Sequence, residues 1–297
     1  MRYRPFGNTG TAVSAVSLAM TDTQRRLSPA DWTSIVYRAL ENGVNCFEVV
    51  GRDPAILDGL AHGLATLERH LVFVALRLGA MADRKNDFSA EAVTRTVEAM
   101  LARTGFDYID AVLLDDPADD ALPPDTLATL KALKAADRTR MIGVCGEDSA
   151  VDAYISTNAF DILSVPYSLA SGWTTRNRIR AALDHGMTIM GYDFCPDEVH
   201  DRDQPSFLAK RNMFKPANPL AGAGTYAFMH ETRGWTAEEI CMAYALTQPA
   251  LATVQITTEQ VERMDELCEV SEREMPAGLS SRIEMARFGN VRPQAKA

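Results

Sequence analysis

The stretch SPADWTSIVYRALENGVNCFE, residues 28–48, contains a complete helix signal followed by a strand signal. Ser28 suits a helix N-cap, and Pro29 suits the first helical position. Apolar residues then recur at helical spacing until Gly43, a residue type that often ends helices. Residues 44–48 form a near-continuous apolar run, which is typical of a parallel strand buried on both faces. The stretch therefore predicts one helix-to-strand unit of an α/β fold.

The same alternation continues along the chain. Apolar runs predict eight strands, at residues 16–20, 44–48, 71–77, 109–114, 141–145, 162–165, 187–192 and 252–256. Helical spacing predicts helices from residue 29 to Gly43 and at 55–67, 89–105, 124–136, 149–157, 174–185, 236–247 and 259–272. With no break in composition, this order predicts a single domain over residues 1–297 with the (β/α)8 TIM-barrel fold. A doubly wound open sheet is the alternative, disfavoured because no G-x-G-x-x-G follows any strand.

Two segments lie outside this count of strands and helices. Residues 2–15 contain the turn-forming sequence GNTG at 7–10, which predicts an N-terminal β-hairpin. Residues 193–235, which contain several prolines and glycines, predict a long loop after the seventh strand. In a (β/α)8 barrel such a loop is expected over the C-terminal face, where active sites lie.

Composition excludes several classes of function. The 30 Lys and Arg residues against 40 Asp and Glu residues make a nucleic-acid partner or an anionic membrane surface a poor expectation. No apolar run approaches the roughly 20 residues of a membrane span, and the start does not resemble a signal peptide. The five cysteines contain no C-x-x-C pair, which favours a reducing cytoplasm without a disulfide framework. The five histidines have no ligand spacing, so we expect no metal site.

Five segments, in order along the chain, resemble the aldo-keto reductase superfamily. They are MRYRPFGNTG (1–10), ALENGVNCF (39–47), FDYID (106–110), RMIGV (140–144) and PYSL (166–169). The resemblance covers essentially the whole chain. It implies a (β/α)8 barrel closed at the bottom by the hairpin, with a nicotinamide cofactor lying across the top.

The chain departs from this family at all four catalytic positions. Where the family has an aspartate, a tyrosine, a lysine and a histidine, this sequence has Glu48, Asp53, Arg77 and Asp115. Hydride addition to a carbonyl makes an alkoxide that must receive a proton, and an ionised Asp53 has none to give. Arg77 holds its proton too firmly to donate it. We therefore expect that the chain has no catalytic residues for carbonyl reduction. We also expect the four side chains at these positions to meet at the C-terminal face of the barrel.

Two interpretations of these four residues remain open. They can form a structural charge network left after catalysis was lost. Alternatively, clustered carboxylates can raise one another's pKa and support a new acid–base chemistry, as in an NAD(P)-dependent oxidoreductase or a lyase. A metal hydrolase is the weakest alternative, because no histidine lies at a strand end.

The cofactor positions are partly changed. The family's serine–asparagine pair and its glutamine are replaced at Cys145 and Ser164, and Tyr192 stands where the family stacks an aromatic ring on nicotinamide. A plain barrel-rim aromatic is the alternative for Tyr192. After the last strand, TTEQ at 257–260 lacks the basic residues that hold a 2′-phosphate, which favours NAD(H) over NADP(H). The candidate cofactor residues are Tyr192, Cys145, Ser164, Thr257, Thr258 and Gln260.

A barrel that has lost its proton donor but keeps a dinucleotide suits a regulatory role. The family includes potassium-channel beta subunits, which are regulatory partners linked to a cofactor. It also includes bacterial cell-division regulators that lack the catalytic residues. The resemblance therefore implies a cytoplasmic, NAD(H)-binding regulatory protein, with the division protein FtsZ and a histidine kinase as possible partners.

Overall fold

Eight parallel strands close into a barrel in the order β10-β3-β4-β5-β6-β7-β8-β9. The structure is a computed structural model that describes residues 1–297 except 24, 80–85, 119–121, 197–225, 231 and 290–297. The strands are β3 (Val16–Met20), β4 (Cys46–Val49), β5 (Phe73–Leu78), β6 (Ile109–Asp115), β7 (Thr139–Cys145), β8 (Ile162–Pro166), β9 (Thr188–Tyr192) and β10 (Leu251–Ile256). The predicted (β/α)8 barrel is confirmed, and the open-sheet alternative is wrong.

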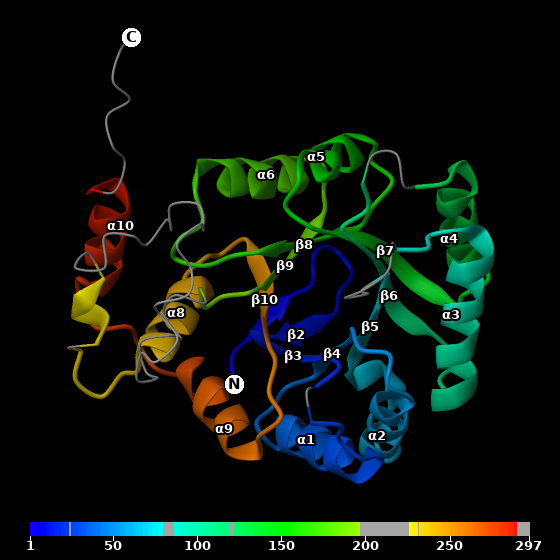
Figure 1. Ribbon diagram of the computed structural model, residues 1–297, viewed down its shortest axis with the longest axis horizontal. Helices are drawn as coiled ribbons and strands as arrows, with labels where there is room; N and C mark the ends of the chain where they lie inside the picture. Colours follow the sequence, from blue (N-terminus) through cyan, green and yellow to red (C-terminus); the bar gives the residue numbers. More distant parts are fainter. Residues whose placement is uncertain (24, 80–85, 119–121, 197–225, 231, 290–297) are drawn as a thin grey trace, which may run out of the picture.

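Helices surround the barrel (Figure 1). They are α1 (Pro29–Glu41), α2 (Pro54–Leu64), α3 (Ala90–Thr104), α4 (Pro124–Ala135), α5 (Ser149–Ser156), α6 (Trp173–Asp184), α8 (Ala237–Leu246), α9 (Val261–Val270) and α10 (Leu279–Gly289). Short 3-10 turns form η1 (Arg69–Leu71) and η2 (Ala227–Met229). The helices α1 to α6, α8 and α9 each overlap a predicted helix, because the signals that predict them are local: an apolar stripe at helical spacing and residues suited to the helix ends.

The helix and the strand predicted within residues 28–48 are present, as α1 and β4. Ser28 caps α1, and its side chain and that of Asp31 exchange hydrogen bonds with the opposite backbone amides. Helix α1 packs closely on α2 at Gly59, where a Cβ would lie 2.2 Å from the Trp32 Cβ atom. The two elements that precede β4 and β5 are thereby held against each other.

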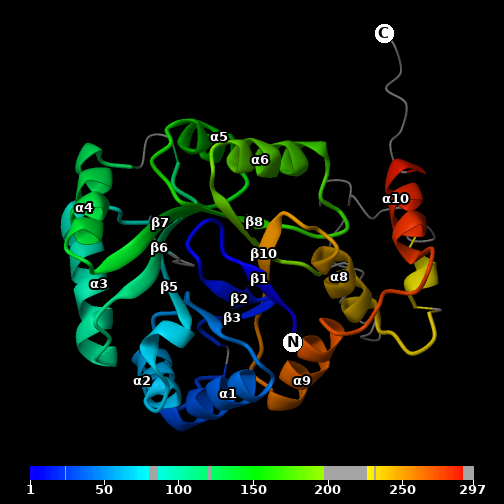
Figure 2. The same cartoon turned by 180° about the vertical axis from the view of Figure 1, so that it is seen from behind.

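The N-terminal hairpin closes one end of the barrel (Figure 2). Its strands β1 (Tyr3–Pro5) and β2 (Ala12–Ser14) are antiparallel. Between them, Phe6 packs into the barrel interior against Phe73, with ring centroids 4.3 Å apart. Gly7 adopts φ +55° beside Thr188 at the start of β9, so the hairpin lies at the N-terminal ends of the strands. The opposite, C-terminal end is left for a site.

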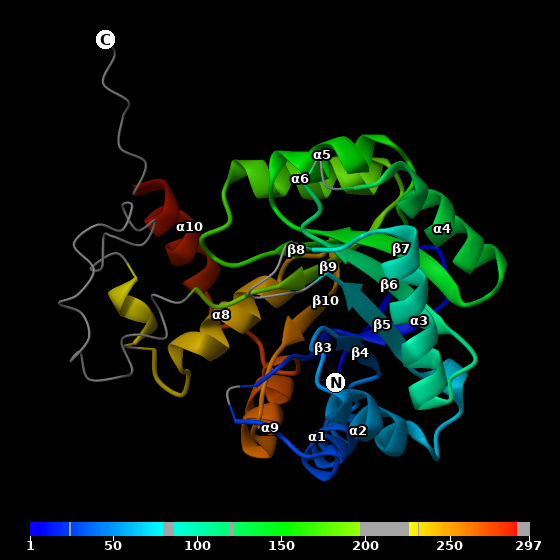
Figure 3. The ribbon, with the colours of Figure 1, turned by 45° about the vertical axis from the view of Figure 1, so that its right-hand side comes forward.

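Helix α10 stands outside the ring of helices beside α8 (Figure 3), and no sequence pattern predicted it. Glu284 of α10 accepts hydrogen bonds from the Tyr244 hydroxyl and from Arg176, at 2.9 Å for the latter. Most of the predicted long loop at 193–235 lies outside the described residues. Among the residues the structure does describe, no helix is long and apolar enough to cross a membrane.

Candidate functional site

An arginine and two carboxylates meet at the C-terminal ends of β4, β5 and β6. Arg77 donates from Nε to Glu48 Oε1 at 2.5 Å, and its Nη1 lies 3.4 Å from Asp115 Oδ1. The Glu48 side chain is fully buried, whereas 9% of Arg77 and 24% of Asp115 remain exposed. Because these strands are neighbours in the barrel, side chains near their ends converge, and the three form one ion cluster.

Two further side chains enclose the guanidinium of Arg77. Gln255 of β10 accepts from Arg77 Nη2 at 3.2 Å and donates its amide hydrogen to the free oxygen of Glu48. The Tyr192 ring lies under the guanidinium, 4.9 Å from ring centroid to Cζ. Sequence reasoning missed Gln255, whose only signal is an amide within the apolar run LATVQI at 251–256. Arg77 is therefore held by Glu48, Asp115, Gln255 and Tyr192, and it still lines a pocket.

Burial and charge set the protonation of this cluster. Burial alone would lower the pKa of Arg77, but Cys145, Glu48 and Asp115 together raise it well above its ordinary value. Burial, with the charge of Glu48, raises the pKa of Asp115 despite the opposing effect of Arg77. Burial likewise raises the pKa of the Tyr192 phenol. A phenol with a raised pKa is a weak proton donor, which is the opposite of what carbonyl reduction needs.

Asp53 does not join the cluster, contrary to the expectation that all four side chains meet. Its carboxylate caps α2 by accepting from the Ala55 amide at 3.0 Å, and it accepts from Arg26 Nε at 2.7 Å. The Ala55 hydrogen bond, followed by Arg26, lowers the pKa of Asp53. The local physical reason is that Pro54 starts a helix whose free amides attract the preceding carboxylate.

A pocket of about 290 Å³ opens beside the cluster at the same end of the barrel. Its lining includes Arg77, Tyr192, Gln255, Thr257, Glu238 and Arg263, together with Asp193, Phe194 and Cys195 at the end of β9. Glu238 and Arg263 form an ion pair on the pocket wall. The hydroxyl, amide and charged groups offer hydrogen-bond donors and acceptors, and the aromatic ring offers a surface on which a planar ligand group can stack.

The six predicted cofactor residues divide into three groups. Tyr192 and Thr257 line the pocket. Cys145 and Ser164 are fully buried in the barrel, where burial raises the pKa of the Cys145 thiol to about 12. Thr258 and Gln260 bind each other instead: the Thr258 hydroxyl donates to the Gln260 carbonyl and accepts from its amide, which builds the turn before α9.

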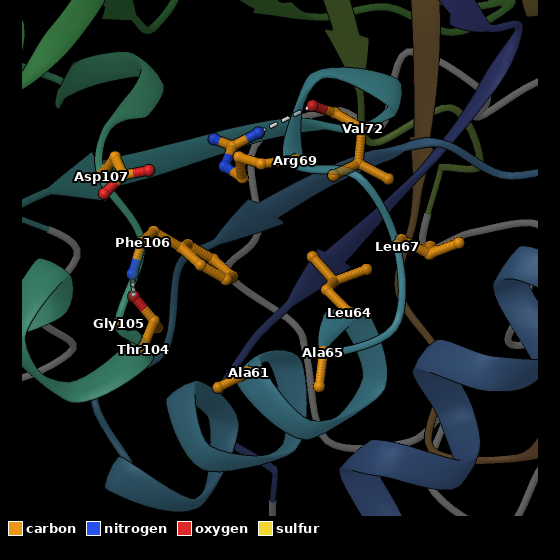
Figure 4. A pocket seen from close by; sticks show the side chains of 10 residues that line it. All are labelled: Ala61, Leu64, Ala65, Leu67, Arg69, Val72, Thr104, Gly105, Phe106 and Asp107. Carbon is orange, nitrogen blue, oxygen red and sulfur yellow. Dashed lines mark hydrogen bonds between the residues drawn. The ribbon is translucent and has the colours of Figure 1, made fainter.

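Other cavities include one beside the site and one at the far end of the barrel. One of about 530 Å³ runs between α2 and α3 and shares Arg77 and Val50 with the site pocket. The other, of about 230 Å³, lies at the opposite end of the barrel (Figure 4). There Arg69 lies over the Phe106 ring at 5.3 Å and donates to the Val72 carbonyl at 2.8 Å. Arg69 of η1 also pairs with the buried Asp110 of β6, whose carboxylate accepts a hydrogen bond from the Val74 amide of β5, so these contacts hold the three elements together.

The backbone is strained at two aspartates beside the cluster. Asp116 follows β6 with φ +44°, and Asp193 follows β9 with φ +49°. Left-handed conformations are uncommon for residues other than glycine, although aspartate tolerates them better than most. Both residues change the direction of the chain directly after a barrel strand ends.

Comparisons with known proteins identify the family of the chain. The sequence model of the Aldo/keto reductase family matches residues 18–286. L-galactose dehydrogenase of Arabidopsis thaliana is 30% identical over 165 residues, which cover 52% of this chain and 51% of that protein. NADH-specific methylglyoxal reductase of Escherichia coli (strain K12) is 25% identical over 231 residues, which cover 66% and 65%. The chain therefore spans about half to two thirds of the length of these curated relatives.

The fold matches solved structures along nearly its full length. The holo form of aldo-keto reductase AKR11C1 from Bacillus halodurans superimposes with a TM-score of 0.75 over 96% of both chains, at 16% identity. The apo form gives 0.74. Since the family model covers most of the sequence and the barrel agrees, the chain belongs to the aldo/keto reductase family.

Proposed function

We propose that this chain is an NAD(H)-binding member of the family that has lost carbonyl reduction and acts as a regulatory protein. One observation carries the proposal: Arg77 is closed into a buried ion cluster with Glu48 and Asp115, and Asp53 is turned away to cap α2. The positions that would supply a proton instead hold structural contacts. No donor with a lowered phenol pKa faces the pocket among the residues the structure describes, since burial raises the pKa of Tyr192.

The pocket residues support a dinucleotide as the ligand. A nicotinamide cofactor supplies hydride chemistry when it is bound; here Tyr192, Gln255, Thr257 and Arg263 are the groups that would hold it. Glu238 pairs with Arg263, so this arginine is already neutralised and is poorly placed to take a 2′-phosphate. A carboxylate on the wall also accepts hydrogen bonds from ribose hydroxyls. These features favour NAD(H) over NADP(H), in line with the NADH-specific relative from E. coli.

The partner class follows from resemblance. Among family members without the catalytic residues, this sequence resembles KidO, a bacterial cell-division regulator. We propose cytoplasmic FtsZ and a histidine kinase as the partners whose affinity responds to the bound dinucleotide. Such coupling typically amounts to about 1–3 kcal/mol, or roughly 5- to 150-fold in affinity.

Calorimetry tests the ligand proposal directly. NADH is expected to bind more tightly than NADPH. Glu238→Gln should narrow that preference because it frees Arg263, whereas Glu262→Gln, an exposed change on the same helix as Arg263, should leave it unchanged. Tighter binding of NADPH by the parent protein would refute the argument that the chain lacks a free basic residue for the 2′-phosphate. If NADH binds but leaves FtsZ and kinase affinity unchanged, the regulatory part fails.

An active oxidoreductase or lyase is the second candidate, and the raised pKa of Asp115 favours it. A partly exposed carboxyl with a raised pKa can act as an acid or base. Oxidation of NADH with a panel of aldehydes and ketones separates the two. A turnover above about 1 s⁻¹ that Asp115→Asn abolishes would establish the enzyme and overturn the regulatory proposal.

A further inference from the structure

The cavity of about 530 Å³ lies between the barrel wall and helices α2 and α3. Its inner wall includes Val49, Leu76 and Leu78, which belong to the apolar layer between the strands and the helices. Leu57 of α2 and Val93 of α3 line it from the helix side. This volume and this mainly apolar lining are typical of small-molecule sites.

Small side chains on α3 leave this space open. Ala92, Thr96 and Ala99 follow one another at helical spacing, so they share one face of α3, and all three line the cavity. Just past the lining residues, Arg103 of α3 and Asp58 of α2 form a two-pronged ion pair, with both N–O distances 2.7 Å. The two helices are therefore tied together at one end of a space that their side chains do not fill.

Three of the four charged side chains that line the cavity are already engaged. The four are Arg52, Arg77, Arg95 and Asp87. Arg77 is neutralised in the buried ion cluster. Arg95 lies 3.7 Å from Glu91, a loose pair on the exposed side of α3. Asp87 accepts a hydrogen bond from the Ser89 amide at 3.0 Å, at the start of α3.

Arg52 is the charged group that remains for a ligand. Its side chain is exposed, and within the described part of the chain its guanidinium has no hydrogen bond or ion pair. The backbone at this position is fixed, because Asp22 Oδ1 accepts from the amides of Arg52 and Asp53, both at 2.9 Å. A free guanidinium therefore stands at a defined place on the edge of an apolar cavity.

We propose that this cavity binds a small amphipathic carboxylate, with its alkyl chain between α2 and α3 and its carboxylate on Arg52. Each buried methylene of the chain adds affinity through the hydrophobic effect. The guanidinium fork matches the two carboxylate oxygens and selects the charged end of the ligand. The site is distinct from the proposed dinucleotide pocket, with which it shares only Val50 and Arg77.

Calorimetry of the full chain with octanoate and octan-1-ol tests the site. Octanoate should bind the parent protein more tightly than octan-1-ol. Arg52→Met should weaken octanoate binding at least about threefold, as expected for a partly solvated ion pair, and leave octan-1-ol unchanged. Arg180→Met is the matched control, because it removes an exposed arginine of α6 that does not line the cavity, and octanoate binding should stay the same.

Charge reversal and cavity filling complete the experiment. Arg52→Glu should bind octylammonium more tightly than octanoate. Ala99→Phe, at an exposed position of α3, should occupy the cavity and weaken both octanoate and octan-1-ol, with circular dichroism confirming that each variant is folded.

Two results would overturn the assignment of the carboxylate to Arg52: equal affinity of the parent for octanoate and octan-1-ol, or octanoate binding that Arg52→Met leaves unchanged. If neither ligand binds, or if folded Ala99→Phe binds octanoate like the parent, the cavity is not the site and the whole proposal is wrong. The measurements contain no dinucleotide, so their failure and the failure of the proposed function are separate results.

Discussion

Replacement of Arg77 by methionine should destabilise the barrel strongly. The side chains are similar in volume, so little cavity is created and the effect is chiefly electrostatic. The Glu48 carboxylate is fully buried, and among the described residues it would retain only the Gln255 amide as a partner. Breaking a buried ion pair by removing one member costs about 3–5 kcal/mol, because a buried charge is left uncompensated. Asp115 adds less, since 24% of its side chain is exposed and water can solvate it.

Urea unfolding at pH 7 of the parent, Arg77→Met, Glu48→Gln and the double variant measures this effect. In the double variant no unpaired charge remains at Glu48, so we expect it to be more stable than Arg77→Met by about 2 kcal/mol or more. Arg38→Met is the control: Arg38 pairs with Asp265 on the surface with 40% of its side chain exposed, and its loss should be far smaller. If Arg77→Met and Arg38→Met lose equal stability, or the double variant is the least stable, the buried-network argument is wrong.

Three further outcomes follow from the structure. Asp53→Ala should lower the urea midpoint at neutral pH, while Asp53→Asn, which keeps the helix cap, should lower it less. Because folding lowers the pKa of Asp53, the stability of the parent relative to either variant should decrease as pH falls through that pKa. Asp115→Asn should gain stability relative to the parent as pH rises above about 4, the ordinary pKa of an aspartate, because folding raises the pKa of Asp115 and ionisation therefore opposes folding. A difference constant with pH would contradict this. Gly7→Ala should destabilise more than Gly10→Ala: both have positive φ, but only the new Cβ at Gly7 would meet Thr188, at 2.2 Å, and equal urea midpoints would refute the clash.

The order of strands and helices was predictable because its signals are local. Capping residues, proline at the first turn and apolar periodicity lie within each element, as in α1, and they predict it without knowledge of its neighbours. Helix α10 was missed for the opposite reason. The Glu284 carboxylate of α10 accepts hydrogen bonds from Tyr244 and Arg176, which are 40 and 108 positions away in the chain. No local pattern encodes a contact of that range.

The site residues also divide into those that local signals predict and those that depend on distant contacts. Glu48, Arg77 and Asp115 were expected together because each lies near the end of one of three neighbouring parallel strands, and the barrel then brings them into contact. Asp53 lies beyond its strand, where the start of α2 competes for its carboxylate. Gln255 comes from β10, 178 positions from Arg77, and only closure of the barrel reveals their hydrogen bond.

Tyr192 links the stability of the barrel to its proposed ligand. One face of its ring already carries the Arg77 guanidinium, so an incoming nicotinamide can stack only on the face toward the pocket. Bound this way, the cofactor would bury the ring further and strengthen the contact between Tyr192 and Arg77, because cation–π attraction grows as water is removed. In the regulatory role that we propose, the ion cluster would couple dinucleotide binding to the strands that hold it. A regulator needs that property, and a reductase does not.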